Sequence, residues 1–138
     1  MIMASAVGPL SGLPLILESE LEILVKYDQK QRPFIIVTDT TSKKFLQFST
    51  VFDDAIGTCA VRMGIPNQEF SAQDIQDLES FGLQRFPIDC DVKWTWDKVF
   101  GTTELAQAAT LAKRIFIEIF GSHGDRSMDL EFGVTTTN

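Results

Sequence analysis

The feature that most constrains this fold is an apolar stripe along residues 104–120. Apolar side chains recur there every three or four positions, the spacing that places them on one side of an α-helix. Gly101, Thr102 and Thr103 predict the start of this helix, and Gly121 its end. A stripe this broad must be covered, so the helix should pack on a sheet or another helix. The stripe contains Leu105, Ala108, Ala109, Ala112, Ile115, Phe116, Ile119 and Phe120, and Leu111 and Ile117 lie on its flanks.

Residues 33–53 are typical of a β-hairpin. Two runs rich in β-branched and aromatic residues, PFIIVTD and KFLQFSTVF, surround the polar turn TTSK. Residues 55–64 predict a third strand, and LQRFPI and DVKWTWDKV predict one or two more. Because the connections are short, we expect the strands to be antiparallel and adjacent in chain order.

Two further helices are predicted. The first begins between Pro14 and Ser19 and ends near Asp28, with Ser19 and Glu22 as a possible capping box. The second spans 72–81: Ser71 is its N-cap and Asp74 the reciprocal position, Phe70 and Ile75 occupy the staple positions, and Gly82 is a left-handed C-cap.

The order α-β-β-β-α-β-β-α predicts the α+β class: a single domain with a twisted antiparallel β-sheet and helices packed mainly on one face. A chain of 138 residues fits one such domain. We expect residues 1–13 to be a flexible N-terminal segment, 14–132 to form the domain, and 133–138 to be a flexible tail. The second sheet face is then either wet or covered by another polypeptide.

The distribution of charged residues argues against nucleic-acid and membrane partners. The formal net charge is −7, and the Lys and Arg residues are scattered, which argues against nucleic acid. Residues 1–17 carry no charge, but they lack a basic start, and Pro9 and Pro14 interrupt the apolar run, so a signal peptide is not predicted. No stretch approaches the roughly 20 apolar residues of a membrane span. We therefore expect a cytoplasmic protein without membrane partners.

The reactive side chains do not form a recognised catalytic pattern. His123, the only histidine, lies in the turn GSHGDRSMD, so pairing with Cys59 or Cys90 would require that turn to fold onto a strand. Cys59 and Cys90 could form one disulfide, although we expect reduced thiols. His123, Asp125 and Asp129 lack the spacing of a zinc or calcium site, and the segment GTTELAQ lacks the Lys of a phosphate loop. No catalytic, cofactor or metal site is predicted.

The Trp-x-Trp pair at Trp94 and Trp96 raises a choice between core and contact surface. In an extended strand both indoles point to one side, with Val92. A core wall is the first interpretation; the alternative places an indole at a groove or dimer contact, where Trp is enriched. Phe100, Leu111 and Ile117 complete the candidate contact residues.

Several of these segments together resemble a known family. They are RPFIIVTDTTSKKFLQFSTVF, FSAQDIQDLESFGLQRFP, the Trp-containing strand and ELAQAATLAKRIFIEIFG. They resemble the type III secretion chaperone-like fold, and most closely its non-secretory branch of YbjN-like and TY-Chap-type bacterial proteins, across residues 33–132. The resemblance implies a small acidic α+β homodimer without a catalytic site, which holds an extended segment of another protein on apolar patches.

The expected function is therefore a non-enzymatic protein-binding module, chaperone-like or adaptor-like, that works as a homodimer. Two alternatives stay open. One is a small enzyme or ligand-binding domain with a pocket between sheet and helices, using Cys59, Cys90 or His123. The other is a regulatory or assembly subunit of a larger complex.

Overall fold

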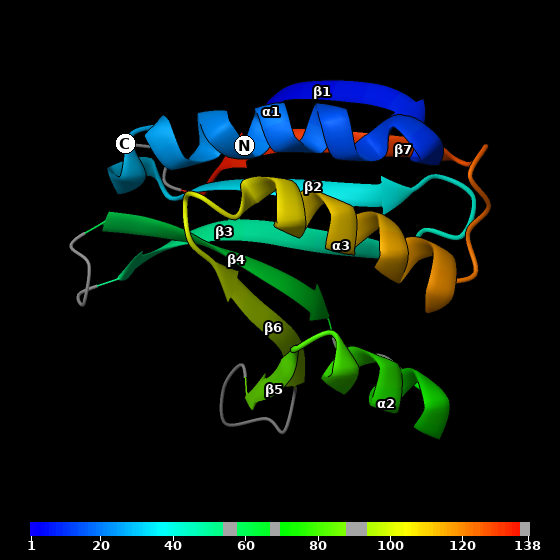
Figure 1. Ribbon diagram of the computed structural model, residues 1–138. Coiled ribbons are helices and arrows are strands. Elements are labelled where there is room, and N and C mark those ends of the chain that lie inside the picture. Colours follow the sequence, from blue (N-terminus) through cyan, green and yellow to red (C-terminus); the bar gives the residue numbers. More distant parts are fainter. Residues whose placement is uncertain (54–57, 67–69, 88–93, 136–138) are drawn as a thin grey trace.

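A computed structural model describes residues 1–53, 58–66, 70–87 and 94–135 (Figure 1). In these ranges the chain forms strands, α-helices and two short 3-10 turns, η1 (Leu10–Gly12) and η2 (Gln29–Gln31). The helices are α1 (Leu13–Lys26), α2 (Ala72–Ser80) and α3 (Leu105–Glu118). The strands are β1 (Ile2–Pro9), β2 (Pro33–Asp39), β3 (Phe45–Asp53), β4 (Thr58–Pro66), β5 (Gln84–Pro87), β6 (Trp94–Phe100) and β7 (Ser127–Val134).

The strands form one seven-stranded open sheet in the order β1-β7-β2-β3-β4-β6-β5, and every neighbouring pair is antiparallel. This confirms the predicted α+β class. Among the predicted strands, adjacency in chain order is wrong at one place, and the structure adds two strands, β1 and β7, that were not predicted. Strand β6 lies between β4 and β5, and β7 lies between β1 and β2. The hairpin of β2 and β3 is as predicted.

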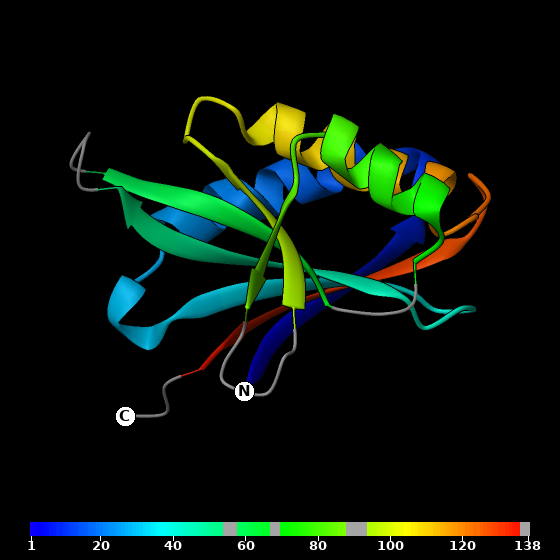
Figure 2. The ribbon, with the colours of Figure 1, turned by 90° about the horizontal axis from the view of Figure 1, so that it is seen from below.

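The three helices lie on one side of the sheet (Figure 1 and Figure 2). Alternation along β2 explains why: Ile35 and Val37 are buried while Phe34, Ile36 and Thr38 between them are only half-buried. The buried side chains meet the predicted apolar stripe of α3 and a second one on α1. Those of α1 are Leu13, Leu17, Leu21 and Leu24, and those of α3 include Ala108, Ala109, Ala112, Ile115 and Phe116.

Strand β1 corrects the expectation of a flexible segment at 1–13. Residues 2–9 pair with β7, and Leu10 is fully buried at the start of η1. Gly8 faces α1, because a Cβ on it would lie 3.2 Å from the Ile16 Cδ1 atom. The sequence alone gave no sign of this strand because its partner, β7, lies more than a hundred residues later in the chain.

Strand β7 corrects the expected tail at 133–138. Val134 ends the strand as a buried residue, whereas residues 136–138 lie outside the described ranges. Gly133 is the position that permits this packing. A Cβ there would lie 2.6 Å from Phe34 Cζ and 2.7 Å from the Met1 carbonyl oxygen, so glycine allows the Phe34 ring to lie over the strand.

The structure confirms some of the predicted helix ends and corrects others. Ser71 accepts from the backbone N–H of Asp74, and Gly82 adopts a left-handed φ of 90°, so both caps of α2 are confirmed. The expected start of α1 between Pro14 and Ser19 is slightly late, because the helix begins at Leu13 and Pro14 occupies its first turn. For α3, the N-cap is Glu104 rather than a threonine, and its carboxylate accepts from the Gly101 N–H.

Within the described ranges, no helix combines the length and apolar character that crossing a membrane requires.

Candidate protein-binding surface

Trp96 belongs to the core. Its side chain is 4% exposed and joins the main hydrophobic cluster on the helix-covered face, and the Arg85 guanidinium carbon lies 5.7 Å from the centre of an indole ring. The side chain of Trp94 lies outside the described part of the structure. Of the two interpretations of the tryptophan pair, the core wall therefore describes Trp96.

The other sequence candidates do not form one surface. Phe100 is buried in the same core, and Leu111, expected on the flank of the stripe, is only 9% exposed and also joins the core. Ile117 is 40% exposed on the outer side of α3. A protein-binding surface must therefore be sought elsewhere.

The sheet face opposite the helices is the largest candidate. One row of side chains crosses it in direct cross-strand register, from β7 through β2, β3 and β4 to β6. This row contains Glu131, Ile36, Gln47, Gly64 and Asp97. It is mostly polar, with one aliphatic side chain.

The neighbouring row is more apolar. It crosses the same five strands and contains Gly133, Phe34, Ser49, Arg62 and Val99. Val99 is 51% exposed, and Phe34 is half-buried by its contact with Gly133. The open face thus mixes apolar and polar side chains, as non-obligate protein interfaces usually do.

A hollow of about 380 Å³ opens beside Phe34. The 3-10 turn η2, strands β2 and β3 and the end of β7 surround it. A lining that combines one aromatic ring with several polar groups can bind an apolar side chain while fixing its orientation. The hollow is lined by Gln29, Arg32, Pro33, Phe34, Gln47, Ser49, Thr50 and Thr135.

Arg32, on the rim of the hollow, has an unusual backbone. Its φ of 52° lies in the left-handed region, which non-glycine residues rarely adopt. The Thr135 N–H and hydroxyl both donate to its carbonyl oxygen, at 3.2 and 3.1 Å, and hold this conformation. Strain of this kind concentrates at functional sites.

Asp97 is a buried carboxylate on the open face. Its residue is 7% exposed, its Oδ2 atom lies 3.7 Å from Arg62 Nε, and its buried Oδ1 atom has no hydrogen-bond partner. Gly64 leaves room for it, since a Cβ there would approach Oδ1 to 3.2 Å. Burial raises the pKa of the Asp97 carboxyl, and the Thr95 hydroxyl and the Arg62 charge offset this only in part.

Asp39, on the helix-covered side of the sheet, is also a buried carboxylate, but its pKa is lowered rather than raised. It is fully buried, and Ser122 Oγ and Arg126 Nη1 donate to its Oδ2 atom at 2.6 and 2.9 Å. The backbone N–H groups of Thr41 and Ser42 donate to Oδ1 at 2.9 and 3.3 Å. Burial alone would raise the pKa of Asp39, but these hydrogen bonds and the Arg126 charge outweigh it and lower the pKa. These hydrogen bonds connect the turn after β2 with the loop before β7 and so contribute to the stability of the fold.

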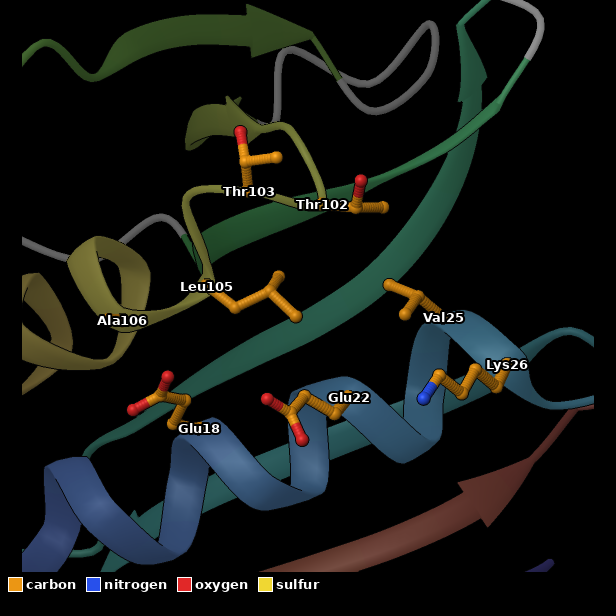
Figure 3. Close-up of a pocket in the computed structure, with 8 residues that line it drawn as sticks. All are labelled: Glu18, Glu22, Val25, Lys26, Thr102, Thr103, Leu105 and Ala106. Carbon is orange, nitrogen blue, oxygen red and sulfur yellow. The ribbon is translucent and has the colours of Figure 1, made fainter.

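A second hollow, of about 330 Å³, lies between α1 and the N-terminal end of α3 (Figure 3). The α3 N-terminus would attract an anion, but the carboxylates of Glu18 and Glu22 line the opposite wall and would repel it. The hollow therefore has no consistent charge for a ligand. Its lining is completed by Val25, Lys26, Thr102, Thr103, Leu105 and Ala106.

The reactive side chains have separate places in the fold. His123 is exposed in the loop between α3 and β7, while Cys59 is a half-buried free thiol in β4 whose pKa is raised by burial. Cys90 lies outside the described residues, so its pairing with Cys59 stays untested. Among the described residues, no three His, Cys, Asp or Glu side chains gather as they would around a metal ion.

Comparison with protein-family models, curated proteins and solved structures finds no match for this chain. Function must therefore be inferred from its own residues. The sequence interpretation missed Arg32 and the hollow beside it, because a left-handed φ at a non-glycine residue leaves no signal in the sequence. The packing of the Phe34 ring over Gly133 could be predicted only after β2 and β7 were known to pair.

Proposed function

We propose that the protein is a non-enzymatic protein-binding module, chaperone-like or adaptor-like, that holds an extended segment of a partner protein on the open face of its sheet. One observation carries the proposal: a hollow lined by Phe34, Gln47 and Ser49 of the open sheet face also contains Arg32, whose backbone is in the left-handed region. The resemblance of residues 33–132 to chaperone-like proteins supports the same function. We expect it to act in the cytoplasm.

The binding mode follows from the side chains on that face. An apolar side chain of the partner would cover Phe34 and remove its ring from water, which stabilises the complex by roughly 25 cal/mol per Å² of apolar surface buried. Gln47 and Ser49 would hydrogen-bond the backbone of the extended segment. Arg32 would bind a carbonyl or carboxylate oxygen, since its guanidinium has no ion-pair partner in the described part of the chain.

Photo-crosslinking in the native cell tests this proposal. A photoreactive amino acid at Ser49, in the hollow, should capture one or a few defined proteins by mass spectrometry. The same group at Gln107, exposed on the helix side, is the control and should not capture them. Equal capture at both positions would contradict the proposal.

A variant of Arg32 sharpens the test. Arg32→Gly removes the guanidinium and relieves the left-handed strain, so the unfolding free energy should hold or rise by up to about 1 kcal/mol. Binding of the captured partner should nevertheless weaken at least about tenfold. Lys30→Gly removes a cation from the same turn without touching the hollow, and it should bind like the unmodified protein. Unchanged affinity in Arg32→Gly would exclude this hollow.

A further inference from the structure

One edge of the molecule gathers most of its exposed apolar side chains. Among the described residues, nine large hydrophobic side chains are exposed, and six of them lie on α1 or on β1 with the residue before it. Val7 is 69% exposed and Leu15 79% exposed. The six are Met1, Ile2, Met3, Val7, Leu15 and Ile23, whereas the other three, Phe52, Val99 and Ile117, are scattered.

The exposed side of α1 carries a short apolar row. Leu15, Ser19 and Ile23 are spaced four apart and share one flank of the helix. Glu18 and Glu22 line the hollow toward α3, on the other flank. On the side toward β1, Ile16 lies beside Gly8 and Glu20 follows it one turn later, so this side of α1 also carries a charge.

Strand β1 itself carries no charged side chain. All 12 Lys and Arg and all 19 Asp and Glu residues follow residue 17, in a chain of net charge −7. Two copies of so acidic a protein repel each other over most of their surfaces. Strand β1 is a place where they can meet without bringing like charges together.

The backbone of β1 is free on its outer side. The Leu10 N–H donates to the Arg126 carbonyl at 2.8 Å, which identifies a hydrogen-bonded pair just beyond β1 and β7. Such pairs alternate in an antiparallel ladder, so Ala4, Ala6 and Gly8 bond toward β7. The N–H and C=O groups of Ser5 and Val7 consequently point outward, where no described strand pairs with them.

We propose that a second copy of this chain occupies that edge, with β1 pairing antiparallel to β1 of the other copy around a two-fold axis at Ala6. This register places Ser5 opposite Val7 twice and gives about four main-chain hydrogen bonds. The bulge between Ile2 and Ala4 confines the regular pairing to residues 4–8. The two seven-stranded sheets thereby become one continuous sheet.

The oligomeric state tests this interface, which does not depend on the proposed function. The protein should sediment as a dimer that dissociates on dilution. Val7→Lys places a charge opposite Asp129 of its own β7, so the fold tolerates it, but it brings cations together at the seam. The dimer should weaken by at least roughly tenfold. Val99→Glu, opposite Arg62, is the matched control and should leave the dimer unchanged.

Two results would overturn the proposal: a strict monomer at high concentration, or a dimer that Val7→Lys does not weaken. Ala6→Cys in a Cys59→Ser, Cys90→Ser background gives an independent measurement. Across the two-fold axis the Ala6 Cα atoms would lie about 4.5 Å apart, within disulfide reach. Ala6→Cys should crosslink two copies far faster than Thr110→Cys on α3. Equal rates would also overturn it, while partner capture at Ser49 would be unaffected.

Discussion

Two buried carboxylates of the same sheet, Asp39 and Asp97, respond to burial in opposite ways. Asp39 receives four hydrogen bonds, and its pKa is lowered. Asp97 has one oxygen without a hydrogen-bond partner, and its pKa is raised. The difference teaches that the number of hydrogen-bond donors around a buried carboxylate, rather than its depth of burial, decides whether its charge stabilises this fold.

The location of each group matches its role. Asp39 ends β2 and binds Ser122 and Arg126 in the loop before β7, so it fixes two chain segments to each other. Asp97 lies on the open face, beside a half-exposed Arg62 at 3.7 Å. That face is the one we propose to be covered by a partner.

Replacing Asp39 should have the largest effect. Asp39→Ala leaves Arg126 and the Ser122 hydroxyl without their acceptor, and the unfolding free energy should fall by about 3 kcal/mol in urea titrations. Asp125→Ala, at an exposed position of the same loop, should change it by less than about 0.5 kcal/mol. A loss below about 1 kcal/mol for Asp39→Ala would remove the contrast between the two carboxylates.

Acidification should have the next largest effect, because protonation removes the charge of Asp39 but leaves its side chain in place. The folded pKa of Asp39 lies below its ordinary value of 3.8, so its stabilising contribution is present above about pH 4 and is lost as the pH falls through the folded pKa. Unfolding free energies measured from pH 6 down to pH 2 should fall less steeply in Asp39→Asn than in the unmodified protein. Identical slopes would mean that Asp39 titrates normally.

Asp97→Asn should shift stability in the opposite direction. An amide avoids burying a charge with an unpaired oxygen, so the unfolding free energy at pH 7 should rise by about 1 kcal/mol. The raised folded pKa of Asp97 means that its penalty is relieved as the pH falls from above that pKa to 3.8, and the variant should lose this trend. A clear loss of stability would show that Oδ1 has a donor after all.

Arg62→Gln should have the smallest effect. Its ion pair with Asp97 is long and the Arg62 side chain is half-exposed, so water screens the interaction and the change should be below about 0.5 kcal/mol. Thermal unfolding of this variant beside Asp39→Ala compares a long, half-exposed ion pair with a buried hydrogen-bonded cluster directly. A large loss would mean that Arg62 compensates the Asp97 charge more fully than the geometry indicates.

The parts of the fold that the sequence predicted are those with local signals. The caps of α2 lie within a dozen residues of one another, the turn of the β2–β3 hairpin is short, and the stripe of α3 repeats within its own helix. Propensity and periodicity suffice for such features. Leu111 shows their limit, because a residue on the flank of a stripe is still buried where a neighbouring element lies beside it.

The parts that were missed depend on distant partners. Ala4 pairs with Phe132, and Asp39 bonds Arg126, so neither contact follows from neighbouring residues. The candidate hollow combines η2, two strands and the end of β7 for the same reason. The edge of β1 could be inferred as uncharged from the sequence, but not as a strand.

The position of β7 has a consequence for biosynthesis. It is synthesised after the other six strands of this sheet, yet it fills an interior place between β1 and β2. The nascent chain therefore keeps β1 unpaired, and one side of β2 open, until residues 127–134 emerge. Completion of the sheet should be slow for a sheet of this size, since its closing contacts join residues more than a hundred positions apart.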